Sequence, residues 1–272
     1  MRSNTVFPWY GREQNIMKLK ESLYLAIGMY SRFPVPRTEW REENMDYVFC
    51  FFPLVGVLVG VCQYALYQAG NLAGAGRFLM AALLTVLPLF LTGKIHMDGY
   101  LDTLDALGSW GDREKKLAIL KDSHTGAFGV IGCGIYLLLS FGAWCEVDTL
   151  PQLSCICLGY VLSRSLSGFS VVTFPKAGQA DSTVAVFSRT ARTKTVRATL
   201  VCQAVGAGGL LLFLTGIPGL CCLAVLLLVF AYYYGMSRKQ FGGITGDLAG
   251  YFLQTGELAV LLTAALGKGL CI

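Results

Sequence analysis

The chain has 272 residues, of which 54% are hydrophobic and only 14% are charged, and its formal net charge is +5. Soluble domains carry about 25% charged residues, so this composition excludes an ordinary soluble fold and indicates that lipid surrounds much of the surface. The ten cysteines lie mostly within apolar segments and form no CxxC pair or Cys/His cluster. They therefore predict neither a disulfide framework nor a zinc site.

The N-terminal region is expected to contain one surface helix. Residues 1–17 are interpreted as an extension, and residues 18–272 as a single integral membrane catalytic domain. The stretch Ile16–Phe33 is only weakly apolar and carries charges near its start. It predicts an amphipathic or re-entrant helix that ends before Pro34 and Pro36, because proline cannot continue a helix.

Long apolar segments follow in series, and a helix needs about 20 such residues to cross a bilayer. Seven segments meet or approach that length: Tyr47–Gly70, Arg77–Gly93, Ala127–Val147, Leu153–Phe174, Ala198–Thr215, Pro218–Gly235 and Asp247–Leu266. The second and sixth are short, so their ends are the least well defined. The sequence thus predicts an all-α, polytopic membrane helix bundle of about seven transmembrane helices.

The basic residues alternate between the two sides of this bundle. Seven Lys and Arg precede residue 47, five lie in the segment Lys94–Gly126, and five lie in the segment Pro175–Arg197. The other set of connections holds only Arg77 and Lys268. Since basic residues prefer cytoplasmic loops, every long loop is predicted to face the cytosol of a bacterial or archaeal cell, with the C-terminus outside.

An acidic segment after the second span is the strongest indication of chemistry. On a helix, Asp98, Asp102 and Asp105 are spaced i, i+4 and i+7, so their side chains share one face. Neighbouring carboxylates repel one another unless a cation neutralises them. Such oxygen ligands suit Mg²⁺, or Mn²⁺ in its place, bridged to substrate phosphates. The alternative is a solvated acidic face at the membrane border.

A second segment closes the same loop. Asp122 is a candidate fourth carboxylate, and Lys121, Ser123 and His124 are candidate substrate or phosphate contacts. His96 and His124 are the only two histidines in the chain, and both lie in this loop. We interpret His96, Asp122 and His124 as candidates for proton transfer, with plain solvation of the histidines as the alternative.

A glycine-rich turn leads into the last span. Gly242 and Gly243 are predicted to expose backbone N–H groups to a phosphate, together with Thr245 at a helix start. Asp247 follows directly and is a candidate metal ligand facing the acidic segment. The alternative interpretation makes Asp247 an N-cap of the last helix.

Several cations have two interpretations. Arg164 lies inside the fourth span, where it is predicted to pair with Glu257 of the last span, either as a structural ion pair or as a substrate contact. The basic loop that contains Arg189 either clamps a polyanionic substrate or binds anionic lipid. The run from Arg113 to Lys116 is interpreted as a solvated basic helix at the lipid headgroups.

These motifs together resemble the cobalamin synthase family, the adenosylcobinamide-GDP ribazoletransferases. The resemblance rests on the run from His96 to Asp105, on Lys121-Asp122-Ser123 with Gly126 and Gly129, and on the run from Gly242 to Asp247. The early Ser31–Pro36 and Phe52–Gly56 stretches are also similar, so that about residues 18–266 are covered in the family's order. Ala106 and Gln254 depart from the family pattern, which usually has Gly and often an acid at these positions.

The resemblance implies a Mg²⁺-dependent enzyme of vitamin B12 assembly. Such an enzyme transfers the adenosylcobinamide-phosphate unit of adenosylcobinamide-GDP to α-ribazole or its 5′-phosphate and releases GMP. The implied partners are these substrates and membrane lipid, with no nucleic acid. Asp98, Asp102, Asp105 and Asp247 would hold the metal in that case.

Two other classes stay open at this point. A CDP-alcohol phosphatidyltransferase also uses membrane aspartates, but its Asp-Gly pair is followed by Ala-Arg, where this chain has Leu101-Asp102. A transporter with an acidic cation site would carry its key acids at mid-membrane, where this chain has only Glu257.

Overall fold

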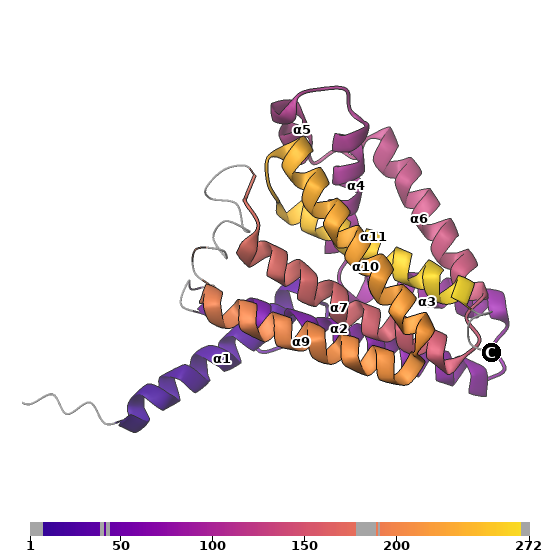
Figure 1. Cartoon of the computed structure of the whole chain (residues 1–272), viewed down its shortest axis with the longest axis horizontal. Coiled ribbons are helices and arrows are strands. Elements are labelled where there is room, and N and C mark those ends of the chain that lie inside the picture. The colour runs from indigo at the N-terminus through magenta and orange to yellow at the C-terminus, as the bar shows by residue number, and fades with distance from the viewer. Residues whose placement is uncertain (1–7, 39–40, 42–43, 178–188, 190, 268–272) are drawn as a thin grey trace, which may run out of the picture.

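The computed structural model describes residues 8–38, 41, 44–177, 189 and 191–267. Over these residues the chain is a bundle of helices with no strands, apart from one isolated bridge between Lys176 and Ile244 (Figure 1). The helices are α1 (Pro8–Tyr30), α2 (Val48–Leu72), α3 (Arg77–Leu91), α4 (Ile95–Gly108), α5 (Arg113–Ile119), α6 (Ala127–Cys145), α7 (Leu150–Thr173), α9 (Thr193–Thr215), α10 (Ile217–Met236), the π-helical turn η2 (Ser237–Phe241) and α11 (Gly246–Leu266). The predicted all-α class is confirmed.

Six helices in the described part of the chain are long and apolar enough to cross a membrane. They are α2, α6, α7, α9, α10 continued by η2, and α11. The predicted second span is only 15 residues long as α3, and the chain then bends by 94° into α4. This multi-pass architecture matches the prediction of about seven spans, and the shortest of them ends at a sharp turn that hydropathy did not indicate.

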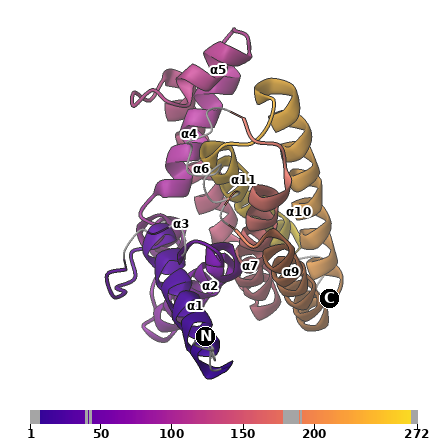
Figure 2. The same cartoon turned by 90° about the vertical axis from the view of Figure 1, so that its left-hand side faces the viewer.

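The long connections gather at one end of the bundle. Lys116 Nζ of α5 donates to Gln240 Oε1 of η2 at 2.6 Å, and Ile244 N donates to Pro175 O at 2.8 Å. The short connections lie at the opposite end, beside the end of α11 (Figure 1). Figure 2 views the bundle from the side on which α1 lies. There Gln152 Nε2 at the start of α7 donates to Ala264 O near the end of α11 at 3.0 Å. The structure therefore separates the two sets of loops as the basic residues predicted.

Helix α1 differs in extent from the predicted N-terminal helix. It begins at Pro8 rather than near Ile16, and it runs without a break across the predicted boundary between residues 17 and 18. It ends at Tyr30, three residues before the expected end, where Ser31 Oγ bonds back to Ile27 O at 2.6 Å. Residues 1–7 of the predicted extension lie outside the described residues.

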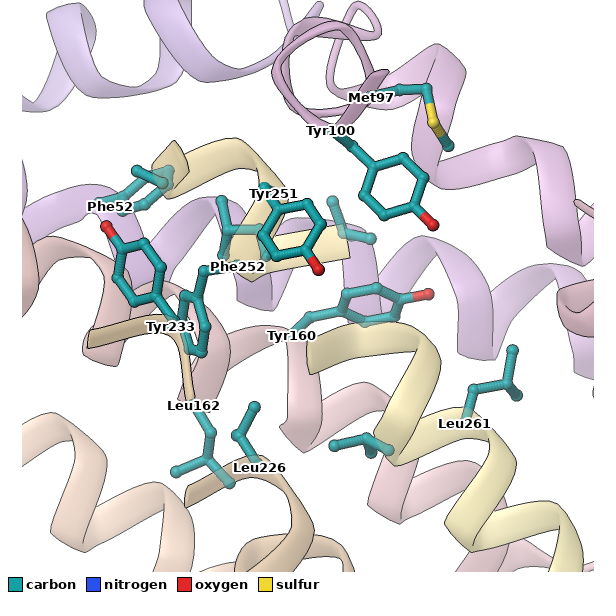
Figure 3. Packing of buried hydrophobic residues seen from close by; sticks show 14 of the residues in the cluster. Phe52, Met97, Tyr100, Tyr160, Leu162, Leu226, Tyr233, Tyr251, Phe252 and Leu261 are labelled. Atoms are coloured by element: carbon teal, nitrogen blue, oxygen red, sulfur yellow. The ribbon is translucent and has the colours of Figure 1, made fainter. Parts of the chain in front are cut away.

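Close helix packing depends on a glycine and on stacked aromatic rings. A Cβ atom at Gly56 would lie 2.4 Å from the carbonyl oxygen of Tyr160, so only glycine lets α2 approach the backbone of α7. Between α4 and α11, the rings of Tyr100 and Tyr251 stack with centroids 5.6 Å apart (Figure 3). These contacts place the start of α11 against α4, which positions the candidate site.

The side of the membrane on which the long loops lie is open to a direct test. Single cysteines at position 112, in α5's loop, and at position 148, in the opposite loop, would be introduced into a chain without native cysteines. The distribution of basic residues predicts labelling of position 112 from the cytosol and of position 148 from outside. Labelling of position 112 from outside only would reverse the whole placement.

Candidate active site

Helix α4 starts at a backbone turn in the left-handed region. Gly93 and Lys94 have φ angles of 64° and 69°, and Lys94 is the only non-glycine residue with positive φ in the described part of the chain. These two residues turn the chain from α3 into α4. The turn brings Gly99 against α11, so closely that a Cβ atom added at Gly99 would lie 2.7 Å from Asp247 Cα. Gly250 of α11 also packs closely on α4, and a Cβ atom added there would lie 3.0 Å from the carbonyl oxygen of His96.

This crossing brings together three carboxylates, which we call the acid cluster: Asp98, Asp102 and Asp247. Asp98 is exposed, whereas Asp102 and Asp247 are half-buried. Asp102 lies on α4, beyond the bend and outside the six spans. Burial raises the pKa of Asp102 to about 6, with further contributions from the charges of Asp98 and Asp247 and smaller ones from Asp105 and Asp122. Repulsion of this kind favours binding of a cation.

Asp105 shares this face of α4 but binds the start of α6. Its carboxylate accepts hydrogen bonds from Gly126 N at 2.6 Å and from Gly129 N at 2.8 Å, and only 8% of the residue is exposed. A Cβ at either glycine would lie 2.5 Å from a carboxylate oxygen. The Asp105 carboxylate thus caps the N-terminal amides of α6. Its close approach leaves no room for a side chain at Gly126 or Gly129. The predicted metal role of Asp105 thus has a structural alternative.

The acid cluster does not enclose a metal on its own. Among the described residues, no three His, Cys, Asp or Glu side chains are close enough together to hold an ion. Mg²⁺ usually binds through one or two carboxylates, several waters and substrate phosphates rather than in an all-protein cage. A Mg²⁺ ion at the acid cluster would therefore need water and substrate oxygens to complete its ligands.

The two histidines have opposite environments. His124 is exposed, and its Nδ1 lies 2.8 Å from Asp122 Oδ1, which also accepts from the backbone N of His124 at 3.0 Å. These hydrogen bonds lower the pKa of Asp122. His96 is 5% exposed, and its Nε2 has no hydrogen-bond partner among the described residues. The Asp122–His124 pair is thus available to solvent and substrate, whereas His96 belongs to the interior.

The glycine-rich turn is held by internal hydrogen bonds. Gly242 N donates to Arg238 O and Gly243 N to Ser237 O, each at 3.2 Å. Both amides are therefore already paired within the turn, and their contact with a substrate phosphate stays a prediction. Thr245 is the N-cap of α11 and accepts from Leu248 N at 3.2 Å. The alternative interpretation of Asp247 as the N-cap is wrong; its carboxylate Oδ2 accepts from Thr245 Oγ1 at 3.4 Å.

The polar and basic loop residues near this end of the bundle are exposed. Lys121 and Ser123 are exposed beside Asp122, and Arg189 is exposed, while residues 178–188 of its loop lie outside the described residues. Arg113 is exposed, as predicted, and its guanidinium also lies against Gly242, where a Cβ would be 2.7 Å from Nη1. The sequence carried no signal for this contact, because it joins two loops more than 120 residues apart.

Arg164 and Glu257 form the predicted ion pair. Arg164 Nη1 lies 2.6 Å from Glu257 Oε1, and the two side chains are 1% and 7% exposed. The same Nη1 donates to Tyr160 O at 3.0 Å, while Ser163 Oγ donates to Glu257 Oε1 at 3.1 Å. The pairing is confirmed. The guanidinium of Arg164 is enclosed by protein, and its contact with substrate stays a prediction.

The fold and the site define a class: a multi-pass membrane protein with a carboxylate cluster where its longest loops meet. The chain belongs to the cobalamin-5-phosphate synthase family, whose pattern matches residues 22–265. A relative from Lachnoclostridium phytofermentans is 41% identical over 94% of this chain and 97% of its own length.

Relatives from Clostridium botulinum and Pseudomonas paraeruginosa are 30% and 35% identical, over 91% and 90% of this chain and 98% of their own lengths. All three relatives are named adenosylcobinamide-GDP ribazoletransferase. No solved structure matches the chain. The family match confirms the resemblance seen in the sequence and favours neither a phosphatidyltransferase nor a transporter.

Proposed function

We propose that this protein transfers the adenosylcobinamide-phosphate unit of adenosylcobinamide-GDP to α-ribazole or its 5′-phosphate, releasing GMP. The product is adenosylcobalamin or its 5′-phosphate. The observation that carries the proposal is the acid cluster, in which α4 and α11 bring Asp98, Asp102 and Asp247 together. Family membership supports the identity of the substrates.

The acid cluster is suited to a diphosphate donor only with a cation present, because three carboxylates alone would repel it. We assign Mg²⁺, or Mn²⁺ in its place, to the acid cluster, where Asp98, Asp102 and Asp247 would hold it together with water and substrate oxygens, since hard oxygen ligands suit these ions. When bound, such an ion would supply positive charge that offsets the charge of the diphosphate and of the departing GMP. Asp105 is assigned to capping α6 rather than to the metal.

The transfer itself needs little covalent chemistry from the protein. A ribose hydroxyl oxygen of the acceptor forms a bond to the phosphorus that carries the cobinamide. The bond from that phosphorus to the bridging oxygen breaks, and GMP leaves with this oxygen. We assign the hydroxyl's proton to the Asp122–His124 pair, which is exposed and close enough to Asp102 to affect its pKa. Lys121 and Ser123 are placed to contact phosphate.

The proposed location is the cytoplasmic membrane of a bacterium or archaeon, with the acid cluster on the cytosolic side. Water-soluble nucleotide donors and the GMP product are cytosolic compounds, and the long basic loops share the end of the bundle that carries the cluster. Membrane lipid is then the partner of the apolar spans.

Membranes containing the protein should release GMP from adenosylcobinamide-GDP only when α-ribazole or its phosphate is added. Excess chelator should abolish this release, and Mg²⁺ or Mn²⁺ should restore it better than Ca²⁺, because the larger ion holds phosphate oxygens less closely. A CDP-alcohol donor serves as the control and should give no product. GMP release that persists in excess chelator would remove the metal from the proposal, and no release under any condition would overturn the reaction.

A further inference from the structure

A cavity of about 230 Å³ opens beside the acid cluster. Five helices line it, and its lining includes Asp98 and Asp247 of the acid cluster together with the exposed Ile95. A group bound inside would therefore continue into the space where the diphosphate is expected. Pockets for drug-sized ligands span about 300–1,000 Å³, so this cavity suits one small ring system and excludes a corrin macrocycle.

Aromatic rings form one wall of the cavity. Tyr30 at the end of α1 packs on Phe52 with ring centroids 4.5 Å apart, and it stacks on His96 at 6.1 Å with an interplanar angle of 16°. Phe49 completes the group at 6.1 Å from Phe52. Side chains of this kind present flat faces on which an aromatic ring can stack.

The floor of the cavity is apolar. Val171 of α7 and Leu253 of α11 are 3% and 1% exposed, and Ser167 adds a hydroxyl. No Lys or Arg from the described residues lines the cavity. It therefore offers no cation that would offset the charge of a phosphate. A neutral, flat ring system with an apolar edge meets all of these conditions.

We propose that this cavity, which we call the base pocket, receives the benzimidazole ring of the ribazole acceptor. The proposal rests on the proposed function and names the residues that select its acceptor. With the ring between Tyr30 and the floor, the attached ribose would lie beside Asp98 and Asp247, which also line the cavity. The base pocket thereby holds the attacking hydroxyl next to the site assigned to the diphosphate.

Tyr30 provides the first test, because two substitutions separate ring stacking from simple bulk. Tyr30→Leu removes the ring and keeps an apolar side chain, so the KM for α-ribazole should rise about tenfold, as for the loss of one stacking partner. The KM for adenosylcobinamide-GDP should stay at the wild-type value. Tyr30→Phe retains the ring and should recover most of the affinity for α-ribazole. Equal KM values for α-ribazole in the Tyr30→Leu and Tyr30→Phe variants would overturn the proposal.

A binding measurement separates this inference from the reaction itself. Purified protein in detergent, without metal or donor, should bind α-ribazole in calorimetry, and GMP should not compete. Ala249→Leu adds bulk on a residue that lines the base pocket and should weaken this binding at least tenfold, whereas Ala259→Leu, elsewhere on α11, should not. α-Ribazole binding that is unaffected in both Ala249→Leu and Tyr30→Leu would overturn the proposal. If wild-type protein binds α-ribazole but releases no GMP, the proposed function is wrong, while the assignment of the base pocket to the ring of α-ribazole is retained.

Discussion

Replacing Asp98, Asp102 or Asp247 by asparagine should lower the rate of GMP release by more than about a hundredfold, because loss of even indirect metal partners costs roughly 10- to 100-fold. Each asparagine keeps the shape of the side chain and removes one anionic ligand. The variants should still insert and fold, and relief of repulsion in the acid cluster should raise the melting temperature of the metal-free protein. Stabilisation by added Mg²⁺ should be lost in all three.

Asp105→Asn should behave differently, since its carboxylate caps α6 at 2.6 and 2.8 Å from two backbone N–H groups. We expect a loss of stability of about 1–2 kcal/mol, with Mg²⁺ stabilisation retained. The exposed Glu114→Gln in the same loop is the control and should change neither quantity. GMP release and melting temperature, each with and without Mg²⁺, distinguish these outcomes. Near-normal turnover in the Asp98, Asp102 and Asp247 variants would mean that the acid cluster is only a solvated face.

The second large effect is expected at the buried ion pair. Arg164→Met leaves Glu257 charged and enclosed by protein, and Glu257→Met leaves Arg164 in the same state. Removal of one partner of a buried pair costs about 3–5 kcal/mol, so both single variants should give little folded protein. The double variant carries no unpaired charge and should recover much of the stability. The yield of monodisperse protein and the melting temperature in detergent measure the stability of the two single variants and of the double variant.

The double variant also separates the two interpretations of Arg164. If the pair is structural, the recovered protein should release GMP at near the wild-type rate. If Arg164 contacts substrate, the protein should fold and remain inactive. Single variants as stable as wild type would contradict the requirement for pairing. The structure favours the structural role, because Arg164 is fully buried and donates to Tyr160 O and Glu257.

The sequence by itself determined the membrane class and the order of the spans. In a bilayer, backbone groups must bond within their own helix, and about 20 apolar residues are needed to cross it. Those requirements act locally, so the predicted ends of the last span, Asp247–Leu266, lie within one residue of α11. Helical periodicity also placed Asp98 and Asp102 on one face of α4 without knowledge of its neighbours.

Only the tertiary structure decided which carboxylates act together. Asp105 shares the face of Asp98, but its carboxylate accepts hydrogen bonds from the N-terminal amides of Gly126 and Gly129 at the start of α6. Asp247 joins the acid cluster because Gly99 lets α11 approach α4. The base pocket likewise depends on five helices that converge from distant parts of the chain. Periodicity describes one helix at a time, whereas these features depend on which helices pack together and how closely their backbones approach.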